Sequence, residues 1–360
     1  MRLVVDARML GYSGIGTYVE NVLPGVLSRC ARLNPVVIAA PGRADRIAGT
    51  SAPGADIVTW NAPPLSWHEL SRPPMPAGSV LWWAPHFNVP IRCRVPLVVT
   101  LHDLLPLVDK RTPLVARIAS RIWLSRIRKM ALRVMCDSAF TRRHAIELAR
   151  IDPGITSIIP LGVRVPLCVK TSSTPPYLLF VGILKPHKNV AGLVRAFRRI
   201  SARIPHRLVL VVRRSGLRGI DQEALAEAMS FGGRIDLLEN ISDETLSALM
   251  CGADLLIQPS FSEGFGLPPL EAMATGTPVL AARAGALPEV CGDAAMYCDP
   301  GSDEDIAVRI LEILGDSRLR ARLSAAGRVR AARYTWERCA KRTAETLLDA
   351  AAASRAVRAL

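Results

Sequence analysis

The stretch DLLIQPSFSEGFGLPPLEAMATGTPVLAA, residues 254–282, decides the fold. Its first part, DLLIQPS (254–260), is a short apolar run that predicts a buried strand, and TPVLAA (277–282) predicts a second strand. Between the two runs, Pro268 suits the first turn of a helix and Gly276 suits its end. A strand, a loop, a helix and another strand in this order predict a unit of a parallel α/β sheet.

The same alternation of short β-rich runs and amphipathic helical stretches continues through both halves of the 360-residue chain. The predicted strands are residues 2–7, 36–41, 79–84, 97–103 and 133–138 in the first half, and 177–182, 207–212, 235–240, 254–260 and 277–282 in the second. Half of the residues are hydrophobic and 21% are charged, which is typical of a globular protein, and the length favours two domains. We therefore predict an α/β protein with two Rossmann-like domains.

The domain boundaries follow from the composition. Residues 166–176 lack periodicity and concentrate Ser, Thr and Pro, as linkers do. We expect an N-terminal domain over residues 1–165, then this linker, then a C-terminal domain over residues 177–335. Residues 336–360 are rich in Ala and Arg and predict a C-terminal helix, which is free to return to the N-terminal domain.

The net charge of +15 is concentrated in the first half, where residues 1–165 hold 21 Lys and Arg against 10 Asp and Glu. Such a positive field favours nucleic acid, anionic lipid or a phosphorylated substrate as a partner. Aromatic residues make up only 5% of the chain, and no RRM, KH or helix-turn-helix signature occurs. We therefore expect no nucleic-acid partner.

Residues 112–135 predict a basic amphipathic helix. Its apolar face would carry Ala119, Trp123, Ile127, Met130 and Val134, and its basic residues elsewhere are Arg117, Arg121, Arg128, Lys129 and Arg133. Two interpretations stay open. One is ordinary core packing with a solvated basic face, and the other is attachment to an anionic membrane surface, where each clustered basic residue gains roughly 1 kcal/mol.

The eight cysteines are scattered without a CxxC pair, so we expect neither a disulfide framework nor a zinc site, and a reducing cytoplasm fits them. The first ten residues lack the apolar core of a signal peptide. The richest apolar window, residues 95–108, is interrupted by His102 and Asp103 and is too short to span a bilayer.

A D-x-D string, Asp303 to Asp305, could be read as a metal site. It directly precedes a helical pattern, so Ser302 or Asp303 as the helix N-cap, with acids in the first turn, explains it better. We predict no metal here.

Two glutamates flank the loop and the helix start of the opening stretch. Glu263 lies in the loop after a predicted strand, where open α/β sheets bind ligands, and Glu271 lies about one turn inside the helix. Gly264 and Gly266 let the backbone approach a ligand with its N–H groups at a helix amino terminus. This pattern favours a polyhydroxylated or anionic ligand. The alternative is that Glu263 is a solvated loop residue and that Glu271 only complements the helix dipole.

The run GFGLPPLEAMATGTPV, residues 264–279, resembles the signature of the family 4 retaining glycosyltransferases, whose GT-B fold has two Rossmann-like domains facing across a cleft. The resemblance covers nearly the whole chain in ordered blocks. In the first half these blocks are DARMLGYSGIGTYVENVL (6–23), PHFNVP (85–90), VVTLHDLLPL (98–107), CDSAFTRR (136–143) and SIIPLGV (157–163). In the second half they are FVGILKPHKNV (180–190), ISDETLSALMCGADLLIQPS (241–260) and ARAGALPEVCGDAA (282–295).

The resemblance implies that the second domain binds a nucleotide sugar. Glu271 would accept hydrogen bonds from the ribose hydroxyls, and Glu263 would hold hydroxyls of the transferred sugar. Lys188 would neutralise the diphosphate as it leaves. The residues whose backbone amides would assist Glu263 are Phe265, Gly266 and Leu267.

The resemblance places the acceptor in the first domain. There Gly14 and Gly16 would bring backbone amides to the donor phosphates. His102 matches the active-site histidine beside the transferred sugar, and Asp103 and Arg142 are candidates for contact with the acceptor or with phosphate. The chain departs from the family at Ile183, where an arginine is frequent. The side chains that could complete the phosphate clamp in its place are Lys185, Arg213 and Arg214.

The resemblance also implies transfer of a hexose with retention of anomeric configuration, without a metal or other cofactor. It is closest to bacterial mannosyltransferases of lipopolysaccharide and exopolysaccharide assembly, so we expect mannose from GDP-mannose, with a UDP-sugar as the alternative donor. The expected acceptor is a glycan or a polyprenyl-diphosphate-linked oligosaccharide, reached from the cytoplasm at the inner face of the membrane. A front-face route and a covalent route through Glu263 both stay open. A nucleotide-sugar epimerase of the same fold is disfavoured by the intact spacing of the two glutamates.

Overall fold

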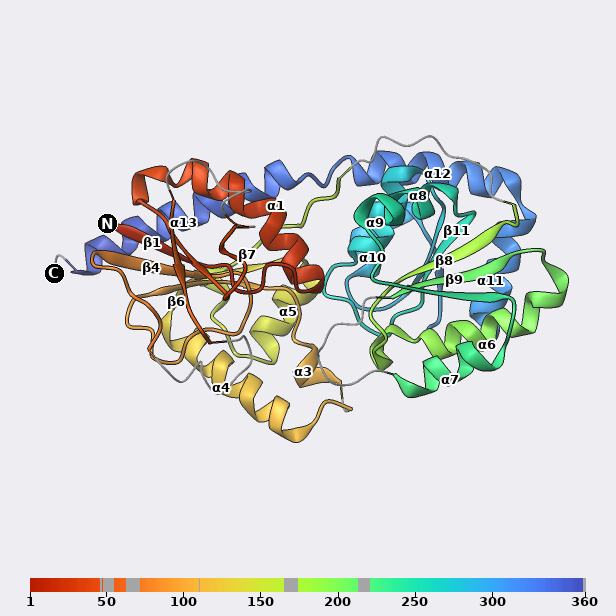
Figure 1. Cartoon of the computed structure of the whole chain (residues 1–360), viewed down its shortest axis with the longest axis horizontal. Helices are drawn as coiled ribbons and strands as arrows, with labels where there is room; N and C mark the ends of the chain where they lie inside the picture. Colours follow the sequence, from red (N-terminus) through yellow and green to blue (C-terminus); the bar gives the residue numbers. More distant parts are fainter. Residues whose placement is uncertain are drawn as a thin grey trace. The chain divides into compact units, whose positions relative to one another are not determined.

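The computed structural model describes residues 1–45, 47, 55–62, 72–109, 111–164, 174–212 and 221–358. The chain divides into two compact units, the first made of Met1–Gly162 with Trp336–Leu360 and the second of Val163–Thr335. Each unit contains one parallel β-sheet with helices packed on it (Figure 1). Most of the expected linker, residues 166–173, lies outside the described residues.

The sheet of the first unit has seven parallel strands in the order β3-β2-β1-β4-β5-β6-β7. The strands are β1 (Arg2–Asp6), β2 (Val36–Ala39), β3 (Asp56–Thr59), β4 (Ser79–Ala84), β5 (Leu97–Leu101), β6 (Ala131–Cys136) and β7 (Thr156–Ile158). The helices are α1 (Ser13–Arg29), α3 (Leu105–Val108), α4 (Leu114–Met130), α5 (Ala139–Glu147) and α13 (Trp336–Arg358).

The C-terminal helix α13 packs on the first unit, although it is the last element of the chain. It lies along α1 (Figure 1), where the Cys30 thiol contacts the Ala344 carbonyl at 3.9 Å. Farther along α13, Ser354 Oγ donates to the Val80 carbonyl of β4 at 2.9 Å. The helix therefore covers the sheet of the unit in which the chain begins.

The sheet of the second unit has six parallel strands in the order β10-β9-β8-β11-β12-β13. The strands are β8 (Tyr177–Gly182), β9 (Arg207–Val212), β10 (Ile235–Glu239), β11 (Leu255–Gln258), β12 (Val279–Ala282) and β13 (Met296–Cys298). The helices are α6 (Val190–Ile200), α7 (Gln222–Ser230), α8 (Asp243–Gly252), α9 (Leu267–Thr275), α10 (Leu287–Cys291), α11 (Asp303–Gly315) and α12 (Ser317–Ala331).

The predicted α/β fold class is confirmed, and all ten predicted strands are present. The three strands that the sequence did not reveal are β3, β7 and β13, and each lies at the edge of its sheet. They have three or four residues, and most of these are only half-buried. An edge strand has a neighbour on one side only and carries less of the apolar signal that marks an inner strand.

The predicted helix over residues 112–135 is wrong at its end, because α4 stops at Met130 and Val134 belongs to β6. Pairing with Val99 of β5 decides this, since it buries Val134 completely inside the sheet. The side chains of α4 that are buried are Ser120, Leu124 and Ile127.

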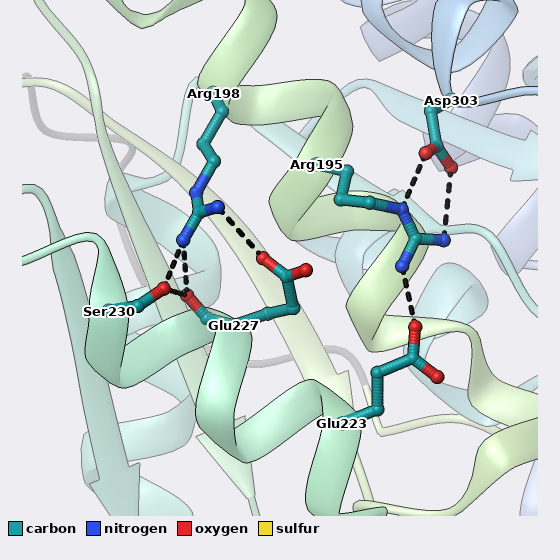
Figure 2. Close-up of polar contacts among 6 residues, drawn as sticks. All are labelled: Arg195, Arg198, Glu223, Glu227, Ser230 and Asp303. Carbon is teal, nitrogen blue, oxygen red and sulfur yellow. Dashed lines mark hydrogen bonds and ion pairs between the residues drawn. The ribbon is translucent and has the colours of Figure 1, made fainter.

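The D-x-D string is a helix start, as predicted. Ser302 is the N-cap of α11, and its Oγ accepts a hydrogen bond from Asp305 N at 3.1 Å. Asp303 accepts from Arg195 Nε at 2.6 Å, and Arg195 also pairs with Glu223, so that α6 is tied to both α11 and α7 (Figure 2). Among the described residues, no group of three or more His, Cys, Asp or Glu is placed to hold a metal ion.

The scattered cysteines gave no signal of a disulfide framework, and a single cysteine of the described segments, Cys251, is disulfide-bonded. Spacing rules detect only cysteines that are close in sequence, whereas a disulfide needs closeness in space. The other cysteines of the described segments are free and buried. No helix within those segments is long and apolar enough to cross a membrane.

Candidate functional site

The candidate residues of both units follow directly after parallel strands. In the second unit, Glu263 lies in the loop between β11 and α9, and Lys188 ends the short helix after β8. In the first unit, His102 follows β5. These are the carboxyl ends of the strands, where open α/β sheets bind their ligands.

Glu263 and Lys188 form a buried ion pair. Lys188 Nζ donates to Glu263 Oε1 at 2.7 Å and to Oε2 at 2.8 Å, and the two side chains are only 13% and 10% exposed. Ser260 Oγ and Gln258 Nε2 also donate to Oε1, at 2.7 and 2.9 Å. Burial alone would raise the pKa of Glu263, but the Lys188 charge and the hydrogen bonds outweigh it and hold this pKa below its usual value. The carboxylate is therefore ionised and fixed in orientation.

A close approach of two backbones fixes the Glu263 loop. Ala286 N donates to the Glu263 carbonyl at 2.9 Å. The adjacent Gly285 has φ +61°, and a Cβ there would lie 2.6 Å from Glu263 N. Only glycine permits this contact, so the block around residue 285 supports Glu263 from outside its own loop.

Helix α9 begins within a few residues of Glu263. Gly266, with φ 105°, is its N-cap, Leu267 is its first residue and Glu271 is a half-buried residue of the second turn. Phe265 is buried, with its ring edge against Tyr334 at a centroid distance of 5.7 Å. The first N–H groups of a helix have no partner inside the helix, and because Pro268 and Pro269 carry no N–H, those of Gly266 and Leu267 remain at this start to bind an oxygen of a sugar or a phosphate. The structure thus brings Lys188, Glu263 and the start of α9 to one place.

His102 is held by both ring nitrogens. Its Nε2–H donates to the Pro85 carbonyl at 2.8 Å, and its Nδ1 lies 2.6 Å from Asp137 Oδ2. Burial opposes a charged ring, but the Asp137 charge and the two hydrogen bonds raise the pKa of His102 above its usual value. A substrate hydroxyl could bond to this ring only by displacing one of these partners.

Asp137 is a candidate site residue that sequence reasoning missed. Leu101 of β5 pairs with Cys136 of β6, so the residues that follow, His102 and Asp137, emerge side by side from the sheet. Asp137 is 2% exposed, and its Oδ1 is buried without a hydrogen-bond partner among the described residues. The sequence offered one signal, a polar residue directly after a predicted strand. To connect it with His102, one must also know that β5 and β6 are neighbours in the sheet.

A second buried histidine, His86, lies after β4. Its Nδ1 accepts a hydrogen bond from Asn88 N at 3.0 Å, so the proton is on Nε2. Burial, together with the charges of Arg8 and His102, lowers the pKa of His86 to about 4, so the ring is neutral at physiological pH.

Asp103 and Arg142 make local contacts instead. Asp103 Oδ1 accepts from Leu105 N at 3.0 Å and so caps the start of α3. Arg142 Nε donates to Thr156 Oγ1 at 2.8 Å and ties α5 to β7. Asp103 and Arg142 thus each have a hydrogen-bond partner inside the first unit. A contact of either side chain with an acceptor or a phosphate stays a prediction.

Gly14 and Gly16 lie in the first turn of α1 and not in an open loop. The Gly16 N–H already donates to the Tyr12 carbonyl at 2.6 Å, and a Cβ on Gly16 would lie 2.7 Å from Gly11 N. A Cβ on Gly14 would meet nothing within 4 Å. Gly16 is therefore required by packing, while Gly14 leaves space at the helix start.

Replacing one partner of the Lys188–Glu263 pair should destabilise the second unit, because a buried charge without its partner costs about 3–5 kcal/mol. We expect Glu263→Gln and Lys188→Met each to lower the melting temperature in calorimetry, and the double variant to recover most of that loss. As a control, Arg309→Met in the exposed pair with Asp305 should cost less than about 1 kcal/mol.

The pair should also respond to acid. Because the pKa of Glu263 is held below the usual pKa of a glutamate, the contribution of the pair to stability is complete above that usual pKa and is lost as pH falls through the lowered one. Glu263→Gln should remove this part of the acid response. If the loss of melting temperature in the double variant equals the sum of the losses in Glu263→Gln and Lys188→Met, the two side chains do not stabilise each other as proposed.

The two glycines of α1 should respond differently to alanine. Gly16→Ala should lower the melting temperature, because overpacking against backbone costs about 1–3 kcal/mol. Gly14→Ala should preserve it or raise stability by up to about 1 kcal/mol, since alanine favours a helix. If Gly14 lies against donor phosphates, this variant should nevertheless weaken donor binding in a titration. Equal melting losses would show that the clash at Gly16 is absent.

Two family models match the chain in tandem, Glycosyltransferase Family 4 over residues 71–165 and Glycosyl transferases group 1 over residues 169–330. The chain is 37% identical to the O-antigen chain mannosyltransferase B of Escherichia coli over 170 residues, 46% of this chain and 44% of that protein. It is 30% identical to a D-inositol 3-phosphate glycosyltransferase of Nocardia farcinica over 287 residues, 73% of this chain and 62% of that protein. The chain thus spans less than two thirds of the length of either relative.

Among solved structures, Anabaena HepE in complex with UDP-glucose superimposes with a TM-score of 0.76 at 19% identity, covering 97% of this chain and 100% of that chain. At this identity the likeness concerns the fold. Together with the two parallel sheets, it shows the GT-B fold. The tandem family matches show that the chain belongs to glycosyltransferase family 4.

Proposed function

We propose that this protein is a retaining glycosyltransferase that moves a hexose from a nucleotide sugar to a glycan or lipid-linked acceptor. The observation that carries the proposal is the buried Lys188–Glu263 pair beside the start of α9. It combines an ionised acceptor for sugar hydroxyls, a cation for phosphate oxygens and a helix amino terminus in one place.

In this mechanism Lys188 stabilises the negative charge that develops on the departing diphosphate, and Glu263 holds the sugar whose bond breaks. Glu271, in the second turn of α9, binds the ribose hydroxyls. The retention route is front-face. Lys188 Nζ and Ser260 Oγ already occupy the Glu263 oxygens, which suits a binding carboxylate more than a covalent nucleophile.

The proposed donor is GDP-mannose, and the proposed acceptor belongs to cell-surface polysaccharide assembly. The name of the E. coli relative, a mannosyltransferase of the O-antigen chain, supports both choices. The alternative donor is a UDP-sugar.

The donor is tested by thermal melting with GDP, UDP, ADP and their sugar conjugates, since a ligand that binds only the folded state raises the melting temperature. We expect GDP and GDP-mannose to give the largest shift, unchanged by EDTA, and expect GDP-mannose to be consumed when a lipid-linked oligosaccharide is supplied. A shift confined to UDP compounds would select the alternative donor. The absence of any nucleotide shift would contradict the function.

We further propose that the first unit docks on an anionic membrane through α4. Its face opposite the core is apolar and exposed, with Leu114 at 65%, Val115 at 71%, Ile118 at 48% and Ile122 at 52%. Helical spacing places this stripe opposite Leu124. Exposed Arg121 lies within its length, and exposed Arg128 and Lys129 follow it along the helix. Apolar residues among basic ones are typical of helices that lie in a membrane interface.

Glutamate in the stripe should prevent docking. We expect Ile118→Glu/Ile122→Glu to reduce sedimentation with anionic vesicles at least tenfold (about 1.4 kcal/mol). We also expect added salt to weaken the binding of the wild-type protein to these vesicles. The matched control is Met229→Glu/Val329→Glu, which changes two exposed apolar residues of the second unit. Equal sedimentation of the stripe variant and this control would contradict the docking surface.

A further inference from the structure

A hollow of about 310 Å³ lies beside α4, and four arginines form most of its lining. The lining residues are Arg72, Arg92, Cys93, Arg94 and Arg126. None of them is acidic, and within the described residues no ion pair involves any of the four arginines. Four cations around one space repel one another, so an anion bound there would gain from all of them.

Arg126 is already held in place. One Nη donates to the Cys93 carbonyl, and Cys93 is itself buried, with its thiol against the Val95 carbonyl at 3.6 Å. The Arg126 Nε is buried and has no hydrogen-bond partner among the described residues. A guanidinium that is fixed before binding loses little conformational freedom when it bonds an anion.

The hollow is remote from the candidate transfer site of the same unit. Cys93 and Arg94 lie shortly before β5, which begins at Leu97, and Arg126 lies about one turn before the end of α4, which leads into β6 at Ala131. The hollow is thus near the amino ends of these strands, whereas His102 and Asp137 follow their carboxyl ends. An anion bound there is not the donor nucleotide.

The position along α4 indicates the source of the anion. Arg126 is one helical turn beyond Ile122, the last residue of the exposed stripe. A headgroup phosphate of a lipid layer in contact with the stripe would lie within reach of the hollow. Guanidinium forks bind phosphate through paired hydrogen bonds, and the volume equals about ten water molecules, enough for one or two phosphate groups.

We propose that the hollow binds the phosphomonoester or diphosphate headgroup of a membrane lipid. This inference rests on the proposed membrane docking of α4, and it is independent of the transfer reaction. It gives the docking surface a preference among anionic lipids that charge alone would not supply.

The test compares vesicles of phosphatidylcholine with phosphatidic acid, a phosphomonoester, and with phosphatidylserine, a diester, at matched surface charge. We expect the wild-type protein to bind the phosphatidic acid vesicles about tenfold more tightly, equivalent to 1.4 kcal/mol. Arg92→Ala/Arg94→Ala should remove this preference. The control, Arg128→Ala/Lys129→Ala, deletes two exposed charges of α4 and should weaken binding to both vesicles equally.

The other outcomes overturn the inference in distinguishable ways. Equal wild-type binding to both vesicles would leave α4 docking intact and exclude a headgroup site. Binding to neither would refute docking and the headgroup site together. Tight binding of free pyrophosphate, with no preference between vesicles, would assign the hollow to a soluble anion. Nucleotide binding should be unchanged in Arg92→Ala/Arg94→Ala. Nucleotide binding therefore tests the transferase proposal, and vesicle binding tests the headgroup site, independently of each other.

Discussion

When helices cover both faces of a parallel sheet, a ligand can bind only where the strands end. This constraint decides where the candidate residues of both units lie. Helices cover the two sheets, and the inner strands, such as β4 and β11, are buried at every residue. Polar side chains can therefore do chemistry at the carboxyl ends, where Glu263 and Lys188 lie in one unit and His102 and Asp137 in the other. The sheets beneath set the places where these loops begin.

The Lys188–Glu263 ion pair and the His102–Asp137 contact both lie in nearly dry surroundings. Removing a charge from water is costly, and the cost is offset only by a close partner with good hydrogen bonds. Lys188 with Glu263 meets this condition at 2.7 Å, and His102 with Asp137 at 2.6 Å. Such contacts fix the orientation of the side chains before the substrate binds. A transferase needs this, because side chains that are already in place can stabilise the leaving phosphate without rearranging.

The first unit combines two chemically different surfaces. Its carboxyl edge carries few, precisely held polar groups, whereas α4 carries an exposed apolar stripe and the nearby arginine hollow. This division explains why the net positive charge of the chain is concentrated in the first half. In the proposed function, the basic half faces the membrane that carries the acceptor, and the second unit binds the soluble donor.

The sequence by itself determined the α/β class, ten of the strands, the cap at Ser302 and the family, because each rests on local periodicity or on ordered motifs. Tertiary structure alone decided the edge strands β3, β7 and β13, the end of α4 at Met130 and the contact of Asp137 with His102. An edge strand exists because a neighbour offers hydrogen bonds, and Asp137 meets His102 because β5 and β6 are adjacent in register. Those are properties of pairing between distant segments, which local sequence patterns do not encode.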